Sequence, residues 1–309
     1  MRISILGLGA LGRVFAAAFA RTEHEIHLHV RGERGAHAML EGLHICGASQ
    51  EQTPAERFIF TCEELERPPS FEQQSDVVIL AVKSHSLPSL LDVAAALLKP
   101  NGTALTIANG LGHVQTLGRA LGPQRVVAAT TTHGAYMAAG RSVVWAGKGS
   151  VQLATTALGP SQAQLEVLVD AFEEAGLLPS VCEDAATMIW DKVLLNLAIN
   201  PIAALTGLEN GELLASERFD TCMMVYREAV RVARMERVPV PDEVAFEHRL
   251  RTVLTTTAQN QCSMLQDIKS GRTTEIDALN GALVDLAEVH GLSVPVNQVL
   301  TALIRACHP

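Results

Sequence analysis

The run ISILGLGALG at residues 3–12 decides the fold of this chain. A short apolar segment is followed by three glycines at GxGxxG spacing, and an Ala-rich helical pattern continues to Ala20. In that context Gly7 permits a tight turn, Gly9 lets the backbone approach a pyrophosphate, and Gly12 lets helix and strand pack closely. Free N–H groups at the helix start would face the phosphate charge. Residues 7–12 therefore predict a dinucleotide-binding loop, with an ordinary strand–helix turn as the weaker alternative.

Around this loop, the first 180 residues alternate short β-rich runs with helical patterns. Strands are predicted at 3–6, 26–30, 77–82, 104–108 and 126–129, and helices at 10–20 and 87–98. Several strands are apolar at every position, as expected for strands covered on both faces. The alternation predicts an α/β fold with a doubly wound parallel sheet of the Rossmann type. Residues 142–145 and 151–154, joined through Gly147-Lys148-Gly149, predict an appended antiparallel hairpin.

The pattern changes after Cys182. Long helical runs are predicted at 183–205, 212–237, 242–270 and 274–290, with no convincing strand between them. We therefore predict a cofactor-binding Rossmann domain at residues 1–182 and an all-α domain at residues 183–309.

Composition excludes several classes of protein. Apolar residues make up 48% of the 309 residues and charged residues 18%, which excludes a disordered chain. A net charge of −9 argues against nucleic acid or an anionic membrane as the main partner. The six cysteines show no metal-site or disulfide spacing, so we expect reduced thiols in a cytoplasmic protein. The apolar N-terminus is interrupted by Arg13, which argues against a signal peptide.

The residue that ends the second predicted strand indicates which cofactor is bound. NAD-binding proteins usually carry Asp or Glu there, whereas this chain has Arg31. A guanidinium pairs with a 2′-phosphate that a carboxylate would repel. Arg31 therefore predicts NADP(H), with a solvated surface arginine as the second interpretation.

Nearby histidines do not indicate a metal site. His27 and His29 share one face of a predicted strand and His24 lies close by. No carboxylate or thiol set with metal-ligand spacing accompanies them, so we predict no bound metal.

A polar stripe marks the first helix of the second domain. Lys192, Asn196 and Asn200 recur every four residues within an apolar run, so they lie along one helix face. A lysine and two carboxamides are costly to bury without a partner. An exposed stripe is the alternative. Pro201 predicts a bend that frees backbone groups near Asn200.

At this point the residues resemble the 2-dehydropantoate 2-reductase (ketopantoate reductase) family over nearly the whole chain. The resemblance rests on GLGALG at 7–12, AVKSH at 81–85, NGLG at 109–112, TTTHGA at 130–135, KVLLNLAINP at 192–201, NGEL at 210–213, SMLQDI at 263–268 and TEIDALNG at 274–281. It implies a Rossmann domain, a helical domain, and NADPH-dependent reduction of ketopantoate to (R)-pantoate in pantothenate and coenzyme A synthesis. The family also includes relatives that act on other 2-oxo acids.

The resemblance implies catalytic roles for Lys192, as proton donor, and for Glu275. It implies substrate contacts at Lys192, Asn196, Asn200, Asn210, Asn260 and Ser263, with Ser263 binding the carboxylate. Taken alone, Glu275 is an ordinary acid in a first helical turn, Asn210 begins an interhelical turn, and Ser263 lies within a long helix. Cys262 departs from the small hydroxyl residue that is more usual before this serine.

The resemblance also implies cofactor contacts at Gly7, Leu8, Gly9, Ala10, Leu11, Gly12, Arg31, Lys83, Asn109, Ala135 and Glu275. Lys83 and Asn109 follow apolar strands, at the sheet edge where open α/β folds bind ligands, although each is also suited to capping a strand end. We interpret His133 as structural because Lys192 explains proton delivery better.

The sequence thus predicts an oxidoreductase that delivers hydride from NADPH to the C2 carbonyl of a small 2-oxo acid bound between the two domains. One alternative is a related reductase of another 2-oxo acid or an imine. The other is a non-catalytic NADP(H)-sensing protein, in which Lys192 or Glu275 would be expected to be lost. The sequence leaves the oligomeric state open, including a homodimer.

Overall fold

The computed structural model describes residues 1–64, 68–138 and 142–307 of the 309-residue chain. The chain forms two compact units, which we describe separately. The first comprises Met1–Ala108 and His113–Ala185, and the second comprises Asn109–Gly112 and Ala186–Pro309. Residues 109–112 group with the second unit although a strand of the first precedes them. The N–H of Leu111 donates to Ala278 O at 2.9 Å, which ties this loop to the helical unit.

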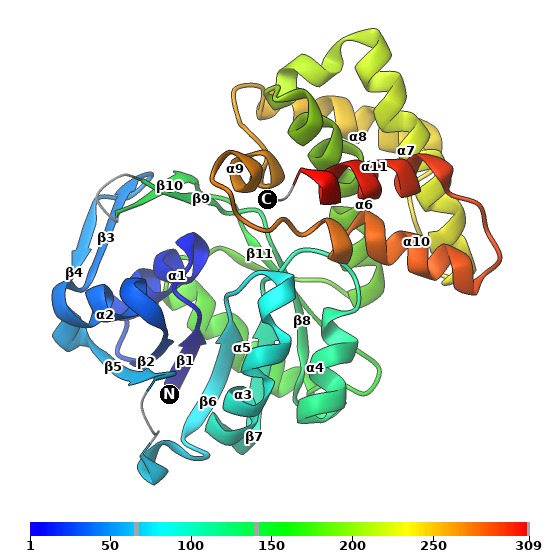
Figure 1. Cartoon of the computed structure of the whole chain (residues 1–309). Helices are drawn as coiled ribbons and strands as arrows, with labels where there is room; N and C mark the ends of the chain where they lie inside the picture. The colour runs from blue at the N-terminus through cyan, green and yellow to red at the C-terminus, as the bar shows by residue number, and fades with distance from the viewer. Residues whose placement is uncertain (65–67, 139–141, 308–309) are drawn as a thin grey trace. The chain divides into compact units, whose positions relative to one another are not determined.

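A five-stranded parallel sheet forms the centre of the first unit (Figure 1, blue to cyan). Its spatial order is β5 (Phe58–Cys62), β2 (Glu25–Val30), β1 (Arg2–Leu6), β6 (Ser75–Leu80) and β7 (Leu98–Thr106). Strand β1 pairs with β2 on one side and with β6 on the other. The strand order therefore reverses at β1, which puts the loop after Leu6 at the switch point of a doubly wound sheet.

Helices cover both faces of this sheet, as the fully apolar strands predict. They are α1 (Ala10–Ala20) and α5 (Gln162–Glu174) on one face, and α3 (Leu91–Leu97) and α4 (His113–Leu121) on the other. Val77 and Ile79 of β6 lie in the first apolar cluster, whereas Val78 and Leu80 lie in the second. Successive side chains of a strand point to opposite faces, so a strand covered on both sides is apolar throughout. The predicted fold class is confirmed.

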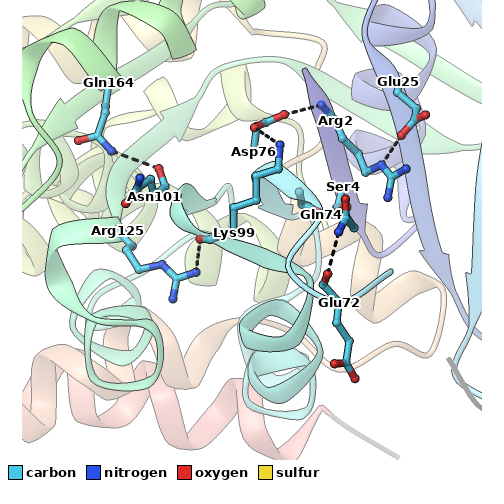
Figure 2. Close-up of polar contacts among 11 residues, drawn as sticks. Arg2, Ser4, Glu25, Glu72, Gln74, Asp76, Lys99, Asn101, Arg125 and Gln164 are labelled. Carbon is cyan, nitrogen blue, oxygen red and sulfur yellow. Dashed lines mark hydrogen bonds and ion pairs between the residues drawn. The ribbon is translucent and has the colours of Figure 1, made fainter. Parts of the chain in front are cut away.

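Polar contacts tie the amino ends of the sheet strands together, at the edge opposite the carboxyl ends, where open α/β sheets generally bind ligands (Figure 2). Asp76 of β6 accepts the backbone N–H of Arg2 at 2.8 Å and the ammonium of Lys99 at 2.6 Å. Arg125 donates to the carbonyl of Lys99 at 2.6 Å. One carboxylate thereby links the first residues of β1 and β6 to the beginning of β7.

The predicted hairpin over residues 142–154 is wrong. Strand β10 (Val143–Gly147) pairs with β9 (Gly134–Met137) and with β3 (Leu43–Gly47), whereas β11 (Val151–Thr155) pairs with β8 (Val127–Thr131) and β12 (Pro179–Val181). Strand β4 (Glu51–Thr53) completes the β10 sheet. The glycine that suggested a hairpin turn has another role, because a Cβ on Gly149 would lie 2.3 Å from the Thr132 carbonyl carbon. Because Gly149 has no side chain, the segment between β10 and β11 can pass close to the backbone of Thr132 between β8 and β9.

The second unit is helical. Its elements are α6 (Ala185–Thr206), η7 (Asn210–Leu214), α7 (Ser216–Met235), α8 (Glu243–Thr256), α9 (Ser263–Lys269), η8 (Ile276–Ala278), α10 (Asn280–Val289) and α11 (Pro295–Ala306). They pack around one apolar cluster that includes Leu197, Phe246 and Leu283.

One helix predicted over residues 242–270 is two helices. Helix α8 ends at Thr256 and α9 begins at Ser263, and the backbone between them pairs with another segment. The N–H of Asn210 donates to Asn260 O and that of Gly211 to Ala258 O, each at 3.0 Å. These tertiary hydrogen bonds use carbonyls that a continuous helix would need.

Helix α6 has the length and composition of a membrane-spanning helix, but 67% of its apolar window is buried inside the protein. A core helix has the same composition. It continues through Pro201, the residue at which the sequence predicts a bend.

Candidate active site

The loop after β1 has the geometry that its glycines predict. Gly7 has a φ of +99°, and a Cβ there would lie 2.3 Å from a Val82 methyl carbon. A Cβ on Gly12 would lie 2.1 Å from Gly7 O, so only glycine lets α1 start this close to the turn. No acidic residue occupies the first turn of α1 and no side chain caps it. The loop over Gly7, Leu8, Gly9, Ala10, Leu11 and Gly12 therefore fits a pyrophosphate by its backbone and its charge.

Arg31 lies between β2 and α2 (Gly32–Glu41) as the N-cap residue of that helix. Its guanidinium is exposed, 3.4 Å from Ser86 Oγ and 3.8 Å from a Glu63 carboxylate oxygen. The side chain is available to a phosphate, but acidic groups follow the neighbouring strand β5. Arg31 would therefore have to exchange a weak ion pair for a cofactor phosphate.

The remaining predicted cofactor residues are divided between the units. Lys83 precedes the short η3 (Ser84–Ser86) after β6, and Ala135 pairs with Trp145 between β9 and β10 in the first unit. Asn109 and Glu275 group with the second unit.

Lys192, Asn196 and Asn200 all lie on α6 in the second unit, as their spacing predicts. Asn200 is buried, and Lys192 and Asn196 are half-buried. Burial lowers the pKa of Lys192 from 10.5 to about 8, while the Glu275 carboxylate opposes part of this shift. The Lys192 ammonium is consequently a stronger acid than a lysine in water.

Glu275 is a buried carboxylate directly before η8, and only 4% of it is exposed. Its Oε2 accepts a hydrogen bond from Asn109 Nδ2 at 2.9 Å. This contact joins the loop after β7 to the segment that begins η8. A buried carboxylate and a lysine with lowered pKa form the titratable pair expected at a proton-transfer site.

Asn210 and the turn before α9 form a second polar region of this unit. Asn210 is buried and its Nδ2 donates to Thr257 Oγ1 at 2.9 Å. Asn260 accepts the Asn210 backbone N–H, and both Asn260 and Ser263 are exposed. Ser263 is the first residue of α9, not part of a long helix as the sequence predicted.

Cys262, whose role the sequence does not reveal, is the N-cap residue of α9. Its Sγ accepts the backbone N–H of Leu265 at 3.4 Å, which is the task of a hydroxyl at such positions. The same sulfur lies 3.6 Å from Asn200 O. The Cys262 thiol therefore caps the start of α9 in the way that a hydroxyl usually does.

His133 has both ring nitrogens engaged. Gly149 N–H donates to Nδ1 at 3.1 Å, and Nε2 lies 3.1 Å from Leu177 O. The proton must then be on Nε2, and burial lowers the pKa of His133. A histidine held neutral by two backbone groups is unsuited to proton delivery.

The histidines of β2 belong to a buried hydrogen-bond network. His27 contacts Ser4 Oγ and Thr61 Oγ1, each at 2.8 Å, and His29 contacts Thr61 Oγ1 at 2.9 Å. No group of three potential metal ligands occurs among the residues that the structure describes.

Two features were missed by reasoning from the sequence. A carboxylate of Glu64 accepts the first N–H of α2, beside Arg31. Asn280 donates to the backbone of α6 at Leu197. No local sequence pattern predicts the Glu64 contact. The Asn280 contact could have been expected from Pro201, because a proline inside a helix leaves the carbonyl four residues earlier without its donor.

The chain is similar to known proteins over nearly all of its residues. Residues 3–157 match the family described as ketopantoate reductase PanE/ApbA, and residues 184–308 match its C-terminal family. The 2-dehydropantoate 2-reductase of Halobacterium salinarum is 31% identical, over 99% of this chain and 98% of that protein.

Two solved structures are similar to this chain over nearly its whole length. The PanE/ApbA family ketopantoate reductase from Ralstonia eutropha is 30% identical with a TM-score of 0.85, covering 99% of this chain and 98% of that one. D-mandelate dehydrogenase, solved with NADH and anilino(oxo)acetate, is 25% identical with a TM-score of 0.90 at the same coverage.

Proposed function

The chain belongs to the ketopantoate reductase family, and from that premise we propose that it reduces 2-dehydropantoate (ketopantoate) to (R)-pantoate with NADPH. It is an oxidoreductase of a family that uses NAD(P)(H) and acts on a small-molecule substrate. The product would enter the synthesis of pantothenate (vitamin B5) and coenzyme A.

The observation that carries the proposal is the Lys192–Glu275 pair. A lysine with a pKa of about 8 holds a proton at neutral pH and gives it up more readily than an exposed lysine. As the C2 carbonyl is reduced, negative charge develops on its oxygen. Lys192 Nζ stabilises that charge and then transfers its proton to the oxygen. Glu275 keeps the ammonium charged until this transfer.

The other polar groups of the second unit would orient the substrate. Asn196 and Asn200 continue the Lys192 face of α6, and their amides can bind substrate oxygens. Asn210 and Asn260 would contact the substrate from the η7 side, and Ser263 would bind its carboxylate.

The glycine loop at residues 7–12 fits the pyrophosphate of NADP(H), and Arg31 fits its 2′-phosphate. Lys83, Ala135, Asn109 and Glu275 would hold the nicotinamide half. When bound, this cofactor supplies the hydride for the C2 carbonyl.

Turnover of a substrate panel tests the proposal. NADPH oxidation is followed with ketopantoate, with 2-oxoisovalerate, which lacks the hydroxymethyl group, and with phenylglyoxylate, the 2-oxo acid corresponding to mandelate. We expect the highest kcat/KM with ketopantoate, and Lys192→Ala serves as the control for contaminating activity. A higher kcat/KM with another acid would establish the alternative reductase, which the likeness to D-mandelate dehydrogenase favours. NADPH binding without any turnover would indicate a cofactor sensor.

We also propose a cytoplasmic location without nucleic-acid or membrane partners, in keeping with the net charge of −9. Light scattering on the purified protein measures whether it forms a homodimer.

A further inference from the structure

Helix α6 contains a backbone carbonyl that the helix itself cannot satisfy. Pro201 lies within α6 and has no N–H, so Leu197 O lacks the donor that a helix normally supplies from four residues ahead. Asn280 Nδ2 donates to this carbonyl at 3.3 Å. Asn280 is fully buried, so this contact lies in the interior of the unit. A side chain from α10 thus replaces the missing backbone donor.

The orientation of the Asn280 amide is dictated by its neighbours. Glu228 accepts the backbone N–H groups of Val296 and Asn297, each at 3.0 Å, at the start of α11. Its carboxylate can only accept, so Asn297 directs Nδ2 towards it, at 2.8 Å. Asn297 Oδ1 then accepts from Asn280 Nδ2 at 2.9 Å. This chain of hydrogen bonds from Glu228 through Asn297 therefore fixes Asn280 with its donor end facing Leu197.

This contact lies between two parts of the proposed active site. Leu197 is adjacent to Asn196 on α6, the helix that carries Lys192. Asn280 begins α10, and the N–H of the preceding residue, Leu279, donates to Glu275 O at 3.1 Å. Asn280 therefore connects the segment that holds Glu275 to the helix that holds Lys192.

We propose that Asn280 is a positioning residue that holds the Glu275 segment against α6 and so maintains the placement of Lys192 relative to Glu275. It does so by donating to the carbonyl that Pro201 leaves without a helical partner. The inference rests on the proposed roles of Lys192 and Glu275.

A specific consequence follows for Lys192. Its pKa is set by burial, which lowers it, and by attraction to Glu275, which raises it. If Asn280 holds the two segments together, its loss weakens the attraction and lowers the pKa further. Loss of stability alone would leave the pKa of the folded protein unchanged.

The test is a double-mutant cycle between Asn280→Leu and Pro201→Ala. Asn280→Leu keeps the side-chain size but removes the donor, and we expect kcat to fall by about 10- to 100-fold with little change in the Kd of NADPH. Pro201→Ala restores a backbone N–H for Leu197 O. This N–H satisfies the carbonyl but does not restore the link to the Glu275 segment. The double variant should therefore recover part of the lost Tm and none of the lost kcat, a separation that simple destabilisation would not produce.

The pKa of Lys192 is measured separately by ¹³C NMR titration of its Cε, assigned by the loss of the signal in Lys192→Ala. We expect a lower pKa in Asn280→Leu and an equally lowered pKa in the double variant, because the link to the Glu275 segment is missing from both. Because this readout needs no turnover, it decides the inference even if the wild-type protein does not reduce ketopantoate. The substrate panel decides the proposed function independently.

Tyr226→Phe is the matched control, because it removes the buried hydrogen bond to Pro241 O in the same unit without touching Asn280 or Leu197. It should lower Tm and leave kcat and the Lys192 pKa unchanged. If Asn280→Leu does not fold, Asn280→Ser, with a shorter donor, takes its place in the cycle. A normal Lys192 pKa in the Asn280 variant, or recovery of kcat in the double variant, would overturn the proposal.

Discussion

The backbone N–H of Gly32 donates to the carboxylate of Glu64 at 2.7 Å. Gly32 is the first residue of α2 and directly follows Arg31, the expected binder of the cofactor 2′-phosphate. The contact to Cys62 and then that to Gly32 hold the pKa of Glu64 below its usual range, so the carboxylate is charged at neutral pH. A negatively charged carboxylate is thus hydrogen-bonded to the amide next to Arg31, and in the proposed site Glu64 would oppose the attraction of Arg31 for the 2′-phosphate.

Glu64→Gln is therefore expected to tighten NADPH binding while leaving NADH binding nearly unchanged. The gain should be about two- to fivefold in Kd at low salt and smaller at high salt, because the carboxylate is exposed and its field is screened. Isothermal titration calorimetry with both cofactors measures it. Glu41→Gln, the same charge change at the other end of α2, is the control and should alter neither Kd. An unchanged NADPH/NADH ratio in Glu64→Gln would contradict this role.

Arg31→Ala should have the opposite effect. Losing a charge-assisted contact to the 2′-phosphate should weaken NADPH binding at least about tenfold and spare NADH. Arg31→Lys should recover only part of the affinity, because an ammonium cannot form the two-pronged contact. Equal losses for both cofactors would show that Arg31 does not select between them.

The pH dependence of ketopantoate reduction should follow Lys192. In the proposed mechanism the ammonium is the proton donor, so kcat should be high below a pH of about 8 and fall as the pH rises through that value. Lys192→Ala should lower kcat by ~10²–10⁴ with NADPH binding near wild type. Lys192→Arg should not restore the rate, because a guanidinium is a very weak acid. A near-normal kcat in Lys192→Ala would show that Lys192 only helps to bind the substrate and does not donate the proton.

His133→Phe should affect stability and not catalysis. Phenylalanine keeps a ring beside Phe15 and Trp145 but leaves Gly149 N–H and Leu177 O without their partner. We expect a loss of about 1–3 kcal/mol in the free energy of unfolding, with the pH profile of kcat unchanged.

The lowered pKa of His133 adds an acid-sensitive contribution to stability. Its folded-state pKa lies below the unfolded value of 6.5, so the unfolded chain takes up a proton first. This stability is present above pH 6.5 and is lost as the pH falls through the folded-state pKa. Thermal melts between pH 7 and 5 should show a smaller drop in Tm for His133→Phe than for wild type, and an equal drop would refute the assignment.

Local sequence was sufficient to predict those features that depend only on residues close together in the chain. The GxGxxG loop follows from a strand, a turn and a helix contiguous in the chain, and Gly7 has the positive φ that such a turn needs. The four-residue spacing of Lys192, Asn196 and Asn200 places them on one helix by the same local geometry. The doubly wound class could be predicted because strands covered on both faces are apolar throughout.

Tertiary structure decided what depends on residues distant in the chain. Strands β10 and β11 do not pair with each other, because each pairs with strands from other segments of the chain. Residues 257–262 are not helical, and their backbone carbonyls accept hydrogen bonds from Asn210 and Gly211. Pairing of this kind is set by which backbone groups meet after folding, and no local pattern records it. Glu64 reaches the amide of Gly32 from a different strand of the sheet, and Asn280 reaches Leu197 across 83 residues. The sequence by itself determined the fold class and predicted which residues carry the chemistry, whereas the packed fold decided which buried and charged groups surround them, because desolvation and electrostatic attraction act through space.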